Sequence, residues 1–143
     1  MKKTLFVSFF IAAALLVTSG TALADETISN PKAGTPEHTV SAALKAGISG
    51  NFDAYMATVH PDEKSTKSQR DQRKRYEWKR FQKQAKWYIK TKSPLTFVVA
   101  NRKPDGKKTI RLFVRDQEHK ESMPRPVKLK RDGRSWKISA NSL

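Results

Sequence analysis

The sequence predicts an α+β fold, with three N-terminal helices packed on a curved antiparallel sheet of about four strands. Apolar residues recur at helical spacing between residues 36 and 91, and beyond residue 95 they alternate with polar residues in short runs. Helices followed by hairpins whose strands are apolar on one face are typical of a sheet that helices cover on one side. The chain has 143 residues and no cysteine, so this fold depends on its hydrophobic core and not on disulfides.

A secretory signal peptide is predicted over residues 1–24. Lys2 and Lys3 form a basic n-region, residues 5–17 are largely apolar, and a small-x-small cleavage pattern ends at Ala24. The apolar run is too short to span a bilayer comfortably. We therefore expect an exported protein, periplasmic or secreted, with the signal peptide cleaved after Ala24.

Two short helices are predicted at the start of the folded domain, which we expect to cover residues 35–143 after a flexible lead-in over 25–34. A capping threonine, a first-turn proline and an acid predict a helix near 36–49, which carries one apolar face. A capping asparagine predicts a second helix near 51–60, because the proline that follows disfavours helical geometry.

A long charged helix is predicted near 66–91. It begins with a capping-box pattern at Thr66 and Gln69, and it carries an apolar stripe at helical spacing, made of Trp78, Phe81, Ala85 and Tyr88. Residues 64–92 contain twelve basic and two acidic residues. Most of the excess positive charge of the protein therefore lies on this one helix.

Two hairpins are predicted after the helices. In the first, a β-rich run over 95–100 and an alternating run over 109–115 flank a turn that contains Pro-Asp-Gly. In the second, runs over 127–130 and 136–139 flank an Asp-Gly turn. Trp136 shares the apolar phase of the last run, so we expect its side chain in the core.

Positive charge dominates the chain even without the signal peptide. Cleavage takes away two of the 29 basic residues and none of the 13 acidic ones, which leaves a net charge of about +14. Because export separates the protein from most nucleic acid, we do not expect a nucleic-acid partner. The expected partners are anionic lipid, lipopolysaccharide or acidic polysaccharide, with peripheral membrane contact. A role in solubility alone is the alternative.

The charged helix supplies the candidate anion-binding residues. They are the cations outside the apolar stripe and one aromatic residue beside them: Arg73, Lys74, Arg75, Lys79, Arg80, Lys83 and Trp87. Cationic side chains next to exposed aromatic rings suit a surface that is anionic and partly apolar, such as a membrane interface. A helix face that is merely solvated is the competing interpretation.

Three phrases of the sequence resemble small exported bacterial members of the nuclear transport factor two-like superfamily. They are Ala-Gly-Ile-Ser-Gly-Asn-Phe-Asp-Ala-Tyr at 46–55, His-Pro-Asp at 60–62, and the segment 126–138, and the resemblance extends over residues 35–143. It implies a cone-shaped, cystatin-like arrangement of helices and sheet. It does not fix an activity, because the superfamily contains isomerases, dehydratases, polyketide cyclases and transport adaptors.

The sequence contains no recognisable catalytic, metal or cofactor motif. His60 and Asp62 flank a proline at a helix end, where a capping role is the ordinary explanation, and the three histidines lack the spacing of a metal site. We therefore expect no catalytic residues, no metal and no cofactor. The favoured function is a noncatalytic exported binding module, while an isomerase- or dehydratase-type enzyme and an interaction protein that forms homodimers through its sheet stay open.

Overall fold

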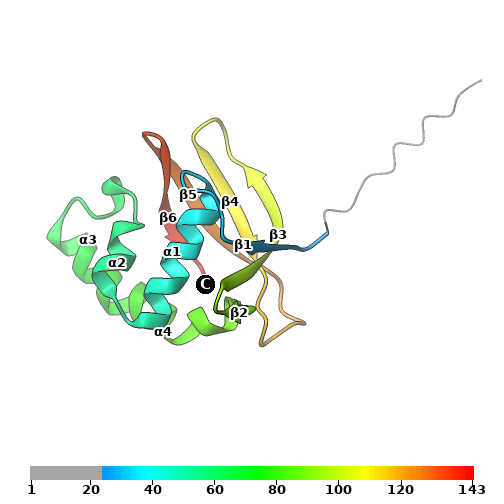
Figure 1. The fold of residues 1–143 in the computed structure, drawn as a ribbon. Coiled ribbons are helices and arrows are strands. Elements are labelled where there is room, and N and C mark those ends of the chain that lie inside the picture. Colours follow the sequence, from blue (N-terminus) through cyan, green and yellow to red (C-terminus); the bar gives the residue numbers. More distant parts are fainter. Residues whose placement is uncertain (1–23) are drawn as a thin grey trace, which may run out of the picture.

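A six-stranded antiparallel sheet forms the framework of residues 24–143, the part of the chain that the structure, a computed structural model, describes (Figure 1). Residues 1–23 of the predicted signal peptide lie outside the described residues, which begin at Ala24. Along the sheet the strand order is β1-β3-β4-β5-β6, and β2 pairs with β3 beside this path. The strands are β1 (Glu26–Ser29), β2 (Thr91–Lys92), β3 (Leu95–Pro104), β4 (Thr109–Val114), β5 (Arg125–Asp132) and β6 (Ser135–Asn141).

The helices gather on one side of the sheet. Figure 1 shows α1 lying across a face of the sheet, in contact with β3, β4 and β6, while α2, α3 and α4 lie beyond α1. Residues 67–88 form one continuous helical stretch of four segments, which include a π-helical segment, η2, and end in the 3₁₀ segment η3. The bounds are α1 (Pro36–Ser49), α2 (Phe52–Ala57), η1 (Pro61–Glu63), α3 (Lys67–Gln72), η2 (Arg73–Trp78), α4 (Lys79–Gln84) and η3 (Ala85–Tyr88).

The α+β class is confirmed, but the predicted count of three helices and about four strands is not matched. The helix predicted near 66–91 is divided into segments with different hydrogen-bond spacing, and the helix predicted near 51–60 ends at Ala57. Two strands, β1 and β2, were not expected. In the described residues no helix is both long and apolar enough to cross a membrane.

The segment 25–34, predicted as a flexible lead-in, contains the edge strand β1. Ile28 is its one buried residue, and it lies opposite Phe97 of β3. A four-residue strand with one inward side chain shows too little alternation of apolar and polar residues to be recognised in the sequence. Its stability comes mostly from pairing with β3. The folded part of the chain therefore begins before residue 35.

The core lies between α1, the helical stretch 67–88 and the inner face of the sheet. Every residue of the predicted stripe, Trp78, Phe81, Ala85 and Tyr88, is buried in it. The predicted caps also form, since the Asn51 side chain accepts a hydrogen bond from the Ala54 N–H at 2.9 Å, and Thr66 and Gln69 complete a capping box. Local rules for helices therefore hold in this chain.

Trp136 is less buried than the alternation predicts. It packs against the core but stays partly exposed, and the Arg131 guanidinium lies 4.5 Å from the centre of its ring. Trp136 sits near the turn end of the last hairpin, opposite Arg131 in the register of β5 and β6. At this end of the sheet a cationic side chain covers the indole, which replaces part of the expected burial.

Candidate functional site: the basic helical stretch and the groove beside it

The helical stretch 67–88 presents three faces with different environments. Its apolar stripe faces the core, a second face lies against the edge strand β6, and a third face is exposed to solvent. The π-helical segment Arg73–Trp78 lies in the middle of the stretch. Segments of this kind occur often at functional sites, since they change which side chains share a face.

Arg73 lies on the face against the sheet, and it is not a free cation. Its side chain is only 12% exposed, and its guanidinium donates to the Glu77 carboxylate at 2.7 Å and to the Glu63 carboxylate at 3.3 Å. It also donates to the backbone carbonyls of Glu63 and Ser139, at 3.1 and 3.2 Å. Arg73, predicted as an anion-binding residue, is therefore committed to contacts within the protein.

Arg80 lies on the same face, seven positions further along the chain. Its Nη2 donates to the carbonyl of Asn141 at 2.6 Å, and its Nε donates to the carbonyl of Leu143 at 3.4 Å. Both arginines thus satisfy backbone carbonyls at the outer edge of β6, which would otherwise be an open sheet edge. The sequence cannot show this, because β6 is about 60 residues away in the chain.

Trp87 also has a role inside the fold. Its ring packs against the core and meets the His119 ring edge-on, with 4.9 Å between the ring centres. Its backbone carbonyl accepts a hydrogen bond from the Gln117 N–H at 2.6 Å. The ring is half-buried and not the open membrane anchor that its place beside the lysines suggests.

The exposed face holds the remaining predicted residues, Lys74, Arg75, Lys79 and Lys83. All four are exposed, and none of them forms an ion pair with any described residue. Of the nine basic residues in 67–88, Arg73 alone is ion-paired within residues 24–143. We call these four residues the exposed cation face. Arg75, Lys79 and Lys83 follow one another at i, i+4 and i+8, and Lys74 lies about 100° around the helix from Arg75, beside the Phe52 ring.

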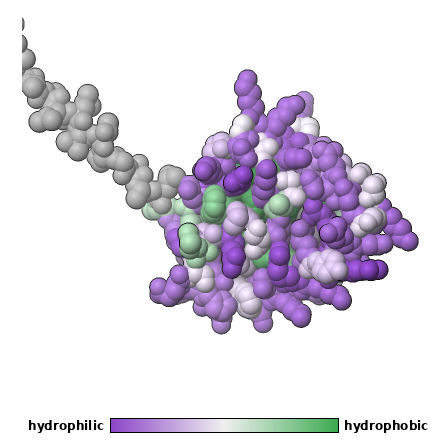
Figure 2. Space-filling view, turned by 180° about the vertical axis from the view of Figure 1, so that it is seen from behind, coloured by the Kyte–Doolittle hydropathy of each residue, from purple (hydrophilic) through white to green (hydrophobic). Residues whose placement is uncertain are grey.

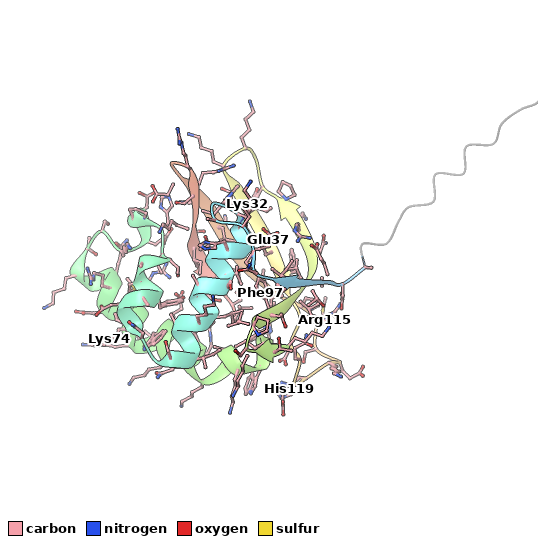
Figure 3. All side chains as sticks on the ribbon, viewed as in Figure 1. Lys32, Glu37, Lys74, Phe97, Arg115 and His119 are labelled. Atoms are coloured by element: carbon pink, nitrogen blue, oxygen red, sulfur yellow. The ribbon has the colours of Figure 1, made fainter. Side chains whose placement is uncertain are left out.

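Outside the helical stretch, five of the 18 basic residues of 24–143 form ion pairs. Arg102 pairs with Glu26 and Glu37, and Arg115 pairs with Asp25. On the polar face of the sheet, Arg111 and Lys128 contact Asp105, and Lys130 contacts Asp62 and Glu63. Figure 3 shows Lys74 and Arg115 at opposite ends of the molecule. Unpaired cations are therefore more closely spaced along the helical stretch, with eight in residues 67–88, than over the rest of residues 24–143, which carry thirteen.

Large apolar side chains are scarce on the described surface. Seen from behind, the molecule is mostly hydrophilic, with small apolar patches between charged side chains (Figure 2). The exposed large apolar residues of 24–143 are Ile48, Tyr76 and Met123, and Tyr76, 70% exposed, lies on the helical stretch between Arg75 and Glu77. Any docking by this stretch is therefore dominated by charge, with one aromatic ring beside it.

A groove of about 480 Å³ separates the helical stretch from the end of β6. Its floor is a polar network: the buried Tyr55 hydroxyl donates to Glu77 at 2.5 Å, and the Asn141 amide donates to that hydroxyl at 3.1 Å. Burial, and then the neighbouring Glu77 carboxylate, raises the pKa of Tyr55, so the phenol stays protonated. The groove is lined by Glu63, Gln69, Gln72, Arg73, Tyr76, Glu77, Arg80, Ala140 and Asn141.

The spacing of charged residues in the sequence indicates the groove side of the helix, although the overall composition does not. Arg73, Glu77 and Arg80 are spaced at i, i+4 and i+7, so they share one face of a helix. Alternating charge along one face indicates paired side chains, whereas the exposed cation face carries only one sign of charge. Sorting the basic residues by face would have separated the two groups.

His60 and Asp62 form a cap. The Nδ1 atom of His60 accepts a hydrogen bond from the Asp62 N–H at 3.3 Å and caps the 3₁₀ helix η1, which fits the ordinary explanation given above. Within residues 24–143 no three histidine or acidic side chains gather in a way that could hold a metal ion.

Comparison of the chain with models of protein families, with curated proteins and with solved structures gives no match. The function of the site therefore has to be inferred from its own geometry.

Proposed function

We propose that this protein is a noncatalytic binding module that docks on anionic lipid, lipopolysaccharide included, through the exposed cation face. The observation that carries the proposal is the lack of acidic partners for Lys74, Arg75, Lys79 and Lys83 among the described residues. A cation near an anionic membrane contributes about 1 kcal/mol of binding free energy. Four such cations on one helix suffice for peripheral binding at low salt.

The neighbouring side chains suit the same surface. Tyr76 is exposed next to Arg75, and tyrosine favours the level of lipid head groups because its ring is apolar and its hydroxyl polar. The long stems of lysine and arginine can lie on an interface while their charged ends reach phosphate groups. Phosphate groups of lipids are the chemistry that this face fits best.

The setting belongs to the proposal as well. The signal-peptide pattern that ends at Ala24 supports export to the periplasm or beyond, where anionic lipid and lipopolysaccharide are accessible. The three sequence phrases, together with helices on one side of an antiparallel sheet, support a cone-shaped, nuclear transport factor two-like fold. On this view the basic helical stretch lies outside the cone.

The geometry favours binding over isomerase or dehydratase chemistry. The acid nearest the groove floor is Glu77, and the Tyr55 hydroxyl and the Arg73 guanidinium both donate to its Oε1 atom. A carboxylate held in this way contributes to the packing of the helix on β6. A buried acid without an ion-pair partner would instead favour such an enzyme.

Binding to vesicles tests the proposal. The exported chain is purified from the producing cell, and its intact mass should match a start at Asp25. It should bind phosphatidylglycerol vesicles and lipopolysaccharide, and should not bind phosphatidylcholine vesicles. Changing Lys74, Arg75, Lys79 and Lys83 together to Gln should weaken binding about a thousandfold at low salt, at about 1 kcal/mol for each cation.

A second variant with the same net charge is the matched control. Four exposed lysines that lie elsewhere and form no ion pair with described residues are changed to Gln: Lys45, Lys92, Lys107 and Lys120. This variant should keep most of the binding. Equal loss in both variants would show that net charge alone acts, and tighter binding to the acidic polysaccharide alginate than to vesicles would assign the face to another partner.

A further inference from the structure

The groove beside β6 has the volume of a small-molecule site. Its volume of about 480 Å³ lies within the range of small-ligand pockets, roughly 300–1,000 Å³. One wall is the helical stretch from Gln69 to Arg80, and the other is formed by Ala140 and Asn141 of β6. It lies on the side of the helix that faces β6, so it is distinct from the exposed cation face.

The groove is electrically balanced in a strongly basic protein. Its lining carries two arginines, Arg73 and Arg80, and two glutamates, Glu63 and Glu77. The whole chain has a net charge of +16. A site for an anion would keep its cations free, whereas here Arg73 is ion-paired with both glutamates. The balance favours a ligand that is polar and uncharged.

The remaining lining residues offer hydrogen bonds and one aromatic surface. Gln72 makes no side-chain hydrogen bond to any described residue, so its amide can both donate and accept. Contacts with the described residues engage Oε1 of Glu77 and leave Oε2 as an acceptor. Tyr76, 70% exposed, stands at the rim of the groove and offers the face of its ring.

The polar groups of the groove floor are fixed before any ligand arrives. Tyr55 and Arg73 hold Glu77 from two directions, and Asn141 is held by Tyr55 and by the Leu143 N–H at 3.0 Å. Groups that are already ordered lose little conformational entropy on binding. A ligand hydroxyl can therefore exchange its water for the Oε2 atom of Glu77, which this network holds in place.

We propose that the groove between Gln69–Arg80 and the end of β6 binds a neutral saccharide of one or two units. Hydroxyl groups of the sugar meet the Gln72 amide and the free oxygen of Glu77, and the apolar face of the sugar ring stacks on Tyr76. This inference does not depend on lipid docking, because it uses none of the four residues of the exposed cation face, and Tyr76 alone lies beside both surfaces.

Nuclear magnetic resonance titration of the chain from Asp25 onward tests the site. The probes are three neutral disaccharides, maltose, cellobiose and N,N′-diacetylchitobiose, and one acidic disaccharide, digalacturonate. At least one neutral probe should shift the backbone amide signals of Gln72, Tyr76 and Asn141. The variants Tyr76→Ala and Gln72→Ala should each weaken that binding about tenfold, as expected for one stacking or bidentate contact.

Two controls separate this site from the rest of the surface. Met123→Ala removes another exposed apolar side chain, 84% exposed, and should leave saccharide binding unchanged. The variant with Lys74, Arg75, Lys79 and Lys83 changed to Gln should also keep it, even where vesicle binding is lost. Shifts elsewhere in the chain, no shifts with any neutral probe, or tighter binding of digalacturonate would overturn the inference.

Discussion

Arg73 and Lys74 are neighbours in the sequence, and their side chains meet opposite environments. The Arg73 guanidinium joins Glu63, Glu77 and the carbonyl of Ser139, whereas Lys74 is exposed with its Nζ atom 5.4 Å from the centre of the Phe52 ring. Successive residues on a helix point about 100° apart, so one can face the sheet while the next faces solvent. A single residue step thus separates a structural cation from a candidate binding cation.

Neutralising these two residues should have very different effects on stability. Arg73→Gln removes charged hydrogen bonds that satisfy two glutamates and a strand carbonyl, and it should lower the free energy of unfolding by about 2–3 kcal/mol. Lys74→Gln should change it by no more than about 0.5 kcal/mol. Urea unfolding followed by circular dichroism measures both. Equal stability of the two variants would show that the ion pairs of Arg73 contribute nothing.

The sequence does not predict which site cations are paired, because their partners lie far away in the chain. The six cations of the predicted site were assigned to one group because composition and spacing cannot distinguish paired from unpaired charge. The partners of Arg73 and Arg80 include carbonyls of β6, more than 60 residues away in the chain. Only the tertiary structure brings them together, and it leaves four of the six residues on the exposed face.

At the scale of elements, the packing of α1 on the helical stretch depends on one glycine. Gly47 lies in the last part of α1 and is buried, and a Cβ atom there would lie 2.7 Å from the Ala85 Cβ and 2.9 Å from the Phe81 Cε1. Ala85 and Phe81 belong to the buried stripe. The two helical elements can approach this closely only because residue 47 has no side chain.

Gly47→Ala should therefore destabilise the protein, although alanine is the better helix former. Helix propensity favours alanine by about 1 kcal/mol, and overpacking of a rigid contact costs about 1–3 kcal/mol. We expect a net loss of up to about 2 kcal/mol in urea unfolding. Lys45→Ala, at an exposed position of the same helix, is the control and should change stability by no more than about 0.5 kcal/mol. A more stable Gly47→Ala variant would mean that α1 moves away from the stripe without cost.

Elements were predictable to the extent that local rules specify them. The caps at Asn51 and Thr66 and the apolar stripe depend on residues a few positions apart, and the structure has all of them. The strands β1 and β2 depend on pairing with β3, and the short helix α2 ends earlier than its following proline indicates. A strand of two to four residues that is stabilised by pairing with a distant strand does not need a recognisable pattern of its own in the sequence.

At the scale of the whole molecule, positive charge has two opposing consequences. Net charge far from zero draws the protein toward anionic surfaces and, at the same time, destabilises the compact state through self-repulsion. Many acids of residues 24–143 already take part in ion pairs, among them Glu26, Glu37, Glu63 and Glu77. Added salt would therefore screen the unpaired positive charge of the helical stretch most strongly.

Salt should therefore change vesicle binding and folding stability in opposite directions. Raising the ionic strength from about 20 mM to about 300 mM shortens the reach of exposed charges, so binding to phosphatidylglycerol vesicles should fall steeply. Over the same range the Tm should rise, because screening reduces the repulsion among the cations of 67–88. Salt also weakens the exposed ion pairs, but these contribute little to stability. The variant with Lys74, Arg75, Lys79 and Lys83 changed to Gln should start with a higher Tm at low salt and gain less from added salt. If the Tm of the parent protein instead falls as salt is added, its ion pairs stabilise the fold more than repulsion among the cations destabilises it. The exposed cation face would then not be a source of repulsion that binding to anionic lipid could reduce.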